Sequence, residues 1–246
     1  QEGPLAAEPG TAVTVEAESG LMHVTGYEGA DPVRSGVAMV DIATGMSMIN
    51  GVLAALLERG RTGVGRRLEF SLFATALSSL GTVIAATSAG GPPSKPWGSS
   101  HPSIVPYRAF AASDGHVVLG ATNDAMFARL VAALDLGAVL GGPEWAGNRA
   151  RVEGRDELER ILAARVGSLP LETVVGCLQA ARVLVARVRT PEAAARGPQA
   201  DALGLIEHDD GVSIARSALG TNGTVRLARA PGLDADGAAL RAELGR

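Results

Sequence analysis

Asp41 lies at the front of an apolar segment and is the residue of this sequence best placed to do chemistry. The segment runs from Gly36 to Gly65 and reads GVAMVDIATGMSMINGVLAALLERGRTGVG, which predicts a strand followed by a helix that starts at the aspartate. Backbone N–H groups and the positive end of a helix dipole favour an ionised carboxylate at such a junction. That carboxylate can attack an activated acyl group and carry it as an anhydride or ester. Aspartate is also among the commonest helix N-caps, and its spacing alone favours that structural role.

The other motifs define neither a catalytic nor a metal site. GRTGVG (60–65) has the glycines of a phosphate-binding loop, but such loops follow a strand and open a helix, whereas this one follows a predicted helix. We therefore interpret it as a helix stop with a turn. No GxSxG sequence is present. The histidines are far apart and lack metal-ligand spacing, so we expect no metal; they are His23, His101, His116 and His208.

Composition predicts a folded cytoplasmic protein. Hydrophobic residues make up 46% of the 246 residues and charged residues 20%, with a net charge of −4. Lys95 is the only lysine, and arginines do not cluster with aromatic residues, so we expect no nucleic-acid surface. Cys177 is the only cysteine, which excludes an internal disulfide and favours a reducing compartment. We find no signal peptide and no uninterrupted apolar run of transmembrane length, and expect no membrane contact.

The elements that would position Asp41 come from the first hundred residues. A helix is predicted over 41–59, where apolar residues recur at steps of three and four. Residues 11–18 alternate valine with polar residues, as a short strand or the start of a helix would. Alternation in RRLEFSL (66–72) predicts a strand, and residues 72–89 predict a second apolar helix. AGGPPSKPWGSS (89–100) is rich in Pro, Gly and Ser and predicts a linker.

The rest of the chain predicts alternating strands and helices. Two short strands are expected in 101–122 around a Ser113–Gly115 turn, followed by a helix over 123–134 capped by Asn123 or Asp124. Residues 191–208 read as turns. The remaining predictions are helices over 155–167 and 172–181, strands over 183–188 and near 211–216 and 224–228, and a short C-terminal helix, ALRAELG. This order favours α/β architecture in two lobes.

Several segments together resemble the class III CoA-transferases, the family that includes formyl-CoA and carnitine CoA-transferases and the α-methylacyl-CoA racemases. The similar segments are EAESGLMHVTG (16–26), GVAMVDIATG with LAALLERGRTGVGRRLEFSL (36–72), HPSIVPYRAFAASDGHVVLGATNDAMFARL (101–130) and VLVARVRTPEAAARGPQADALGLI (183–206).

The resemblance implies an α/β fold with the remainder of a Rossmann-like large domain and a smaller α+β domain, joined by two linkers. The large domain would take residues 1–88, with the linker at 89–100. The small domain would take 101–190, and 191–246 would return to the large domain. The family's N-terminal nucleotide-binding half has no counterpart here. We therefore expect either an interlocked homodimer or an N-terminal partner chain.

By the same resemblance, Asp41 would be the nucleophile of a CoA-transferase. The substrates would be an acyl-CoA and a carboxylic acid, with coenzyme A as substrate and product and no permanently bound cofactor. Ser99, Ser100 and His101 fall where some members place a glycine-rich loop over the active site, and are candidate substrate-binding residues. Asn123, at the position of a racemase glutamate, is a further one.

Two alternatives remain open. A racemase needs two proton-transfer groups, but Thr11 and Asn123 occupy the positions of its bases and neither titrates near neutral pH. The second alternative is a non-catalytic remnant that needs an N-terminal partner. Thr11–Ala12 supports it, because it replaces an aromatic–acid pair common in the transferases and so removes a carboxylate expected near the site.

Overall fold

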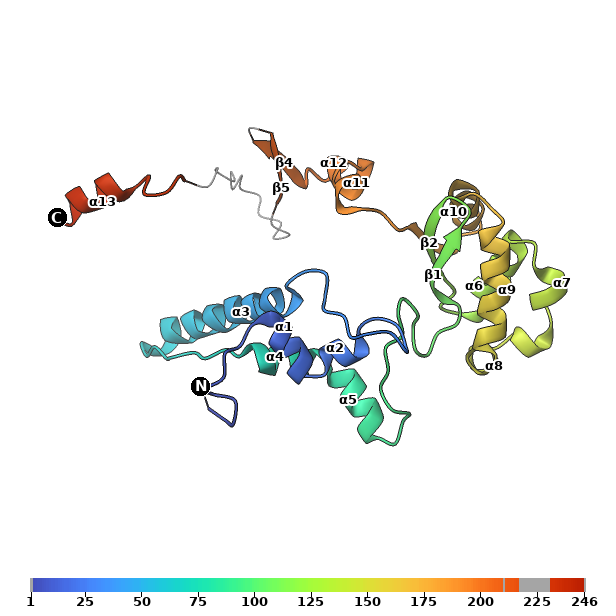
Figure 1. Cartoon of the computed structure of the whole chain (residues 1–246), viewed down its shortest axis with the longest axis horizontal. Helices are drawn as coiled ribbons and strands as arrows, with labels where there is room; N and C mark the ends of the chain where they lie inside the picture. The colour runs from blue at the N-terminus through green and yellow to red at the C-terminus, as the bar shows by residue number, and fades with distance from the viewer. Residues whose placement is uncertain (1, 210, 217–230, 246) are drawn as a thin grey trace. The chain divides into compact units, whose positions relative to one another are not determined.

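The computed structural model describes residues 2–209, 211–216 and 231–245. The chain divides into two compact units, Gln1–Arg187 and Val188–Arg246. Helices and antiparallel sheet occur together in the described residues, so the predicted mixed α and β class is confirmed (Figure 1).

The first part of the larger unit is helical. Its helices are α1 (Ala12–Glu18), α2 (Leu21–Val24), α3 (Met39–Thr62), α4 (Leu72–Ser79) and α5 (Gly81–Ser88). Residues 11–18 therefore form a helix, and the strand alternative is wrong. The backbone N–H of Thr11, the N-cap, donates to Thr14 Oγ1 at 2.8 Å, which satisfies the start of α1. Helix α1 packs against both α3 and α4.

Helix α3 is longer than the predicted 41–59. It begins at Met39 and continues to Thr62, where Gly63 ends it with φ of 74°, a left-handed conformation that suits glycine. The interpretation of GRTGVG as a helix stop is confirmed, with the stop at Gly63. The residues just before Met39 form bends and irregular chain, so the strand predicted ahead of the helix is wrong.

Residues 66–71 do not form the strand that their alternation predicts. A strand needs a neighbouring backbone for its hydrogen bonds, and no described strand pairs with this segment. Instead the segment runs along α3, where the Phe70 ring covers Gly51: a Cβ at Gly51 would lie 2.5 Å from Phe70 Cζ. The helix predicted over 72–89 is two helices, α4 and α5, with a break at Leu80.

The second part of the larger unit is built on an antiparallel sheet of order β1-β2-β3, formed by β1 (Tyr107–Ala112), β2 (Gly115–Gly120) and β3 (Leu184–Arg187). Phe110 pairs with Val117, and the hairpin turns at Ser113–Asp114, as predicted. Helices α9 and α10 pack on this sheet (Figure 1). The helices here are α6 (Asp124–Ala133), α7 (Gly137–Leu140), η1 (Pro143–Trp145), α8 (Asn148–Glu153), α9 (Arg155–Gly167) and α10 (Leu171–Ala180).

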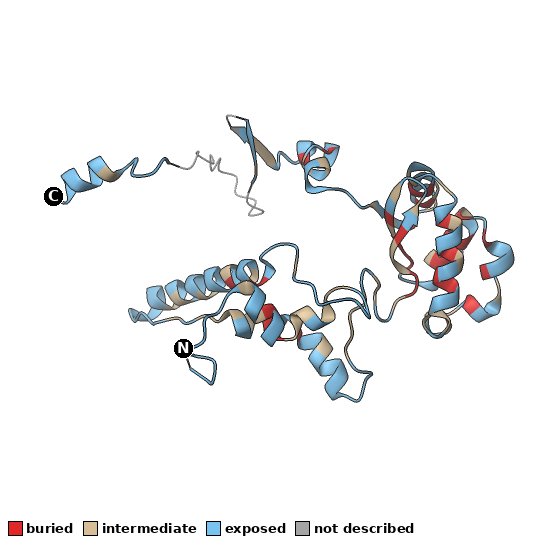
Figure 2. Cartoon of the chain, viewed as in Figure 1, coloured by how far each residue is buried: buried red, intermediate tan, exposed pale blue. Residues whose placement is uncertain are grey.

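The hydrophobic core lies between this sheet and its helices. Val117 and Leu119 of β2 are fully buried, as are Leu162 of α9 and Val174 of α10. Figure 2 shows the contrast with α3, whose surface is largely exposed. In the described part of the chain, the hydrophobic core cluster is built from residues between Val105 and Val183.

The smaller unit contains α11 (Pro191–Ala195), α12 (Pro198–Ala202), β4 (Ile206–Asp209), β5 (Val212–Ala215) and α13 (Gly237–Glu243). The strand predicted near 211–216 and the C-terminal helix are confirmed. The strand predicted at 224–228 lies outside the described residues. The turns expected over 191–208 are in fact two short helices and a strand that pairs antiparallel with β5.

Candidate active site

Asp41 is the third residue of α3, and it is not the N-cap. That position belongs to Ala38, which has no side-chain capping bond. The structural role that spacing favoured for Asp41 is therefore not the one it has. Its carboxylate is exposed, and among the described residues it has no hydrogen bond or ion pair. The carboxylate lies in the first helical turn, where the helix dipole favours negative charge.

The start of α3 is held by buried residues and by the loop ahead of it. Val40, next to Asp41, is 3% exposed, and the buried Thr44 hydroxyl donates to the Val40 carbonyl at 2.7 Å. The loop ahead of the helix is tied by Glu16 of α1, whose Oε2 accepts the Ser35 N–H at 2.9 Å. These contacts hold the start of α3 in place, and Asp41 between the two buried residues is exposed.

Ser99, Ser100 and His101 lie together along the outer edge of β1. Ser99 Oγ accepts the backbone N–H of Ala109 at 3.0 Å, and the His101 N–H donates to the Tyr107 carbonyl at 2.9 Å. The His101 and Tyr107 rings stack in parallel at 5.8 Å between centroids. The Ser100 N–H donates to the Trp97 carbonyl at 2.9 Å, which closes a turn.

Asn123 is the N-cap of α6, and of the two predicted caps it is the one used. Its side-chain oxygen accepts the Met126 N–H at 2.8 Å, and the residue is exposed. Within the described chain, no hydrogen bond or ion pair joins Asn123, Ser99 or His101 to Asp41. The structure thus brings three of the candidates together on β1 and places Asp41 and Asn123 on separate helices.

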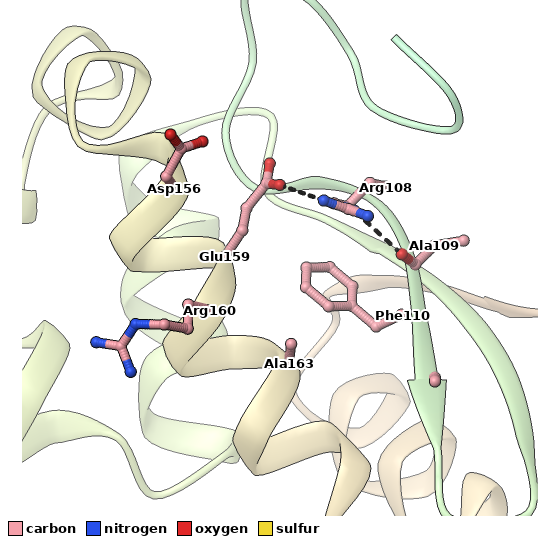
Figure 3. A pocket seen from close by; sticks show the side chains of 8 residues that line it. Arg108, Ala109, Phe110, Asp156, Glu159, Arg160 and Ala163 are labelled. Carbon is pink, nitrogen blue, oxygen red and sulfur yellow. Dashed lines mark hydrogen bonds and ion pairs between the residues drawn. The ribbon is translucent and has the colours of Figure 1, made fainter. Parts of the chain in front are cut away.

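Two hollows lie near these elements. A cavity of about 480 Å³ between α3 and α4 is lined by residues that include Ala43, Ser47 and Phe70. A cavity of about 320 Å³ lies between β1 and α9 (Figure 3), where Arg108 Nη1 donates to Glu159 Oε2 at 2.6 Å. None of the predicted site residues lines either cavity. Glu159, an acid that is 7% exposed, was not predicted from the sequence; its spacing of four from Arg155 on a predicted helix was the available signal.

The comparisons with known proteins identify the family. The model of CoA-transferase family III matches residues 1–237, and the chain belongs to that family. The sequence is 42% identical over 165 residues to mouse succinyl-CoA:glutarate CoA-transferase, covering 67% of this chain and 38% of that protein. It is 30% identical over 247 residues to the acetyl-CoA:oxalate CoA-transferase of Acetobacter aceti, covering 99% of this chain and 64% of that protein.

A solved structure supports the same assignment. The chain is similar to a CaiB/BaiF family protein from Brucella suis with a TM-score of 0.85 and 30% identity, covering 99% of this chain and 65% of that one. The predicted family and fold class are thereby confirmed. The chain covers 38% of the length of the mouse relative and 65% of the Brucella one.

Proposed function

We propose that this chain carries the nucleophile of an enzyme that transfers coenzyme A from an acyl-CoA to a carboxylic acid. The observation that carries the proposal is an exposed, unpaired aspartate in the first turn of α3, in a chain that matches the CoA-transferase family over residues 1–237. An exposed carboxylate can be reached by a thioester, whereas a capping carboxylate would be engaged with backbone amides.

Asp41 would act as a covalent acyl carrier. Its carboxylate attacks the thioester carbonyl, the C–S bond breaks, and an aspartyl–acyl anhydride forms with release of the CoA thiolate. The thiolate then attacks the aspartyl carbonyl of the anhydride, giving an aspartyl–CoA thioester and releasing the first acid as a carboxylate. The incoming carboxylate attacks this thioester, and the steps run in reverse to give the new acyl-CoA and free Asp41. No proton or electron is gained or lost over the cycle.

Backbone amides at the start of α3 would stabilise the tetrahedral oxyanions of these steps. Among the described residues, the N–H groups of Val40 and Asp41 have no hydrogen-bond acceptor, as is usual for the first turn of a helix. Donors that point toward developing negative charge are the main source of catalysis in acyl transfer. The charge develops beside the N-terminal end of α3, whose dipole favours negative charge.

The relatives suggest short dicarboxylic acids as substrates. Relatives at 42% and 39% identity, from mouse and human, are named succinyl-CoA:glutarate CoA-transferases. We therefore propose succinyl-CoA as donor and glutarate as acceptor, with coenzyme A as substrate and product and no resident cofactor. We also propose that the protein is cytoplasmic. We propose that residues 1–88 belong to the large domain, 89–100 form a linker, 101–190 form the small domain and 191–246 return to the large domain.

The exposed side of α3 supports a protein partner for this activity. Apolar side chains recur at alternating steps of three and four, and all are about half exposed: Met39, Ile42, Met46, Ile49, Leu53 and Leu56. Such a stripe, here called the α3 stripe, is the pattern that packs against another helix. The helix is not apolar all round, because polar residues lie off the stripe: Ser47, Asn50 and Glu58. Its length and its mean hydropathy of 1.6 also meet the criteria for a membrane span. We propose that an interlocked second copy or an N-terminal partner chain covers it.

The alternatives are weaker for structural reasons. Thr11 caps α1 through its bonds to Thr14, and Asn123 caps α6, so neither offers a base for racemisation. In a remnant without catalytic turnover, Asp41 would form no covalent intermediate with any acyl-CoA thioester. The proposed transferase and the remnant therefore predict different chemistry at Asp41.

Covalent trapping at Asp41 tests the proposal. The protein is incubated with succinyl-CoA and quenched with hydroxylamine, which converts an aspartyl anhydride or thioester to a hydroxamate, or with borohydride, which reduces the thioester to an alcohol. We expect the mass change on the peptide that contains Asp41, and its absence in Asp41→Asn. Asp31→Asn, which changes an exposed acid of the preceding loop, should leave the modification intact. An unmodified Asp41 peptide with each acyl-CoA tested, both for the chain alone and with an added partner, would favour the remnant.

A further inference from the structure

Residues 94–105, here called the strap, are held from the N-terminal side by the loop that follows α2. The Gly98 N–H donates to the Gly26 carbonyl at 2.7 Å, next to a β-bridge between Tyr27 and Trp97. The Lys95 ammonium donates to Glu28 Oε2 at 2.8 Å. These contacts attach the first half of the strap to residues that belong to the same helical part as Asp41.

The second half of the strap is held by side chains from α8 and α9. The amide of Asn148 donates to the Ser103 carbonyl at 2.9 Å and accepts the Val105 N–H at 3.1 Å. Arg155 binds the two residues just before Ser103: its Nη2 donates to the carbonyls of His101 at 3.0 Å and Pro102 at 2.8 Å. A segment rich in Pro, Gly and Ser is thus tied at both ends.

Arg155 is the residue that joins the two halves. Its guanidinium lies 4.9 Å from the centroid of the Trp97 ring, and the Lys95 ammonium lies 4.5 Å from the same ring. Its Nη1 donates to Glu159 at 3.2 Å, and its side chain is only 13% exposed. Glu159 in turn is paired with Arg108 at the cavity in Figure 3. One side chain therefore contacts the first half of the strap, the second half and α9.

We propose that Arg155 is a positioning residue that fixes the Ser99–His101 turn against β1. The guanidinium is planar and carries donors on both of its terminal nitrogens, so it can bridge two carbonyls and a carboxylate while it stacks on an indole. A lysine ammonium cannot do all of these at once. Because Ser99–His101 are proposed substrate-binding residues, the effect of Arg155 on catalysis rests on the proposed function, but its effect on the strap does not.

Hydrogen exchange of the full chain tests the structural half of the proposal. Arg155→Met should speed exchange of the Gly98 and His101 amides about tenfold, the ratio expected for losing one or two net hydrogen bonds. Arg155→Lys should give an intermediate rate. Arg160→Met, which changes an exposed arginine of the same helix, should leave both rates unchanged. Trp97→Leu removes the stacking surface, leaves the Arg155 hydrogen bonds in place, and should speed exchange at Gly98 more than at His101. Equal rates in Arg155→Met and the wild type would overturn the assignment.

Kinetics test the functional half. In Arg155→Met, the KM for the acyl-CoA should rise about tenfold with kcat within about twofold, because a loosened turn weakens binding while Asp41 is untouched. A purely structural role would lower the fraction of active protein, and hence kcat, and leave KM unchanged; that result would overturn the positioning role. If the wild type transfers no CoA, either alone or with an added partner, the proposed function fails while the exchange rates still decide the role of Arg155 in the strap.

Discussion

Arg151 and Asp124 form an ion pair in which the cation is fully buried and the anion is not. Arg151 Nη2 donates to Asp124 Oδ1 at 2.7 Å, with 0% of the arginine side chain exposed and 62% of the aspartate. The remaining donors of Arg151 bond the carbonyls of Val105, Trp145 and Ala146, and its guanidinium lies 4.4 Å from the Phe127 ring centroid. A side chain from α8 therefore connects α6, η1 and the end of the strap.

Arg151→Met should lower the free energy of unfolding by at least about 3 kcal/mol, because it leaves buried carbonyls without donors. Arg149→Met is the matched control: it lies on the same helix, its side chain is 93% exposed, and it pairs with Glu153. That substitution should cost less than about 1 kcal/mol. Denaturant unfolding of both variants measures the difference, and similar losses in the two would contradict the role given to Arg151.

Gly98→Ala should weaken the attachment of the strap. Gly98 has φ of 58°, where a Cβ costs about 1 kcal/mol or more, and that Cβ would collide with the Tyr27 ring. Gly29→Ala separates the two effects, since Gly29 has φ of 78° but nothing within 4 Å of its Cβ position. We expect thermal unfolding to show a larger loss at position 98 than at 29. Equal losses would mean that Tyr27 moves aside freely.

Polar substitution of the α3 stripe should change association more than stability. Ile49 and Leu53 are each 54% exposed, so Ile49→Gln and Leu53→Gln should each alter the free energy of unfolding by less than about 1 kcal/mol. Both should reduce self-association in sedimentation velocity, because they interrupt an apolar surface. Val40→Ala, at a residue 3% exposed, should cost about 2 kcal/mol and leave association unchanged. A large loss of stability at Ile49 would show that the stripe is covered within one chain.

The start of α11 should give a measurable pH effect. The pKa of the Glu192 carboxyl is lowered, first by a hydrogen bond from its own backbone N–H and then by the Thr190 hydroxyl. A carboxyl with a lowered pKa in the folded state stabilises the fold above its unfolded pKa, and that contribution is lost as pH falls through the folded value. Thr190→Val should raise the pKa of Glu192 in an NMR titration, while Thr190→Ser should keep it low. An unchanged pKa in Thr190→Val would remove the hydroxyl as a cause.

The sequence was informative where a local pattern decides the structure by itself. Asn123 as a helix cap, the turn at Ser113–Asp114 and the glycine stop after α3 all depend on contacts within a few residues. The strand expected at 66–72 failed because alternation does not supply a partner backbone. Helices α11 and α12 were missed because each starts with a proline, which reads as a turn signal but also fits the first helical position.

The site was only partly predictable for a related reason. The position of Asp41 in the first turn of an apolar helix follows from the order of residues around it. The contacts of Arg155 do not, since they depend on carbonyls more than fifty residues earlier in the chain. Periodicity places Arg155 and Glu159 on one helix face, but nothing local indicates that Trp97 lies against them.

The outer edge of β1 has a consequence for aggregation. An uncovered sheet edge is a template on which a strand from another molecule can add. Here the Ser99 hydroxyl accepts a hydrogen bond from the Ala109 N–H, and the His101 N–H donates one to the Tyr107 carbonyl. Two of the backbone groups that an incoming strand would use are therefore already bonded. The opposite edge is β3, which is short and ends at Arg187, itself bound to Glu172. Cross-β growth from this sheet would therefore first have to displace the serine turn at β1, or start from the four residues of β3 at the other edge.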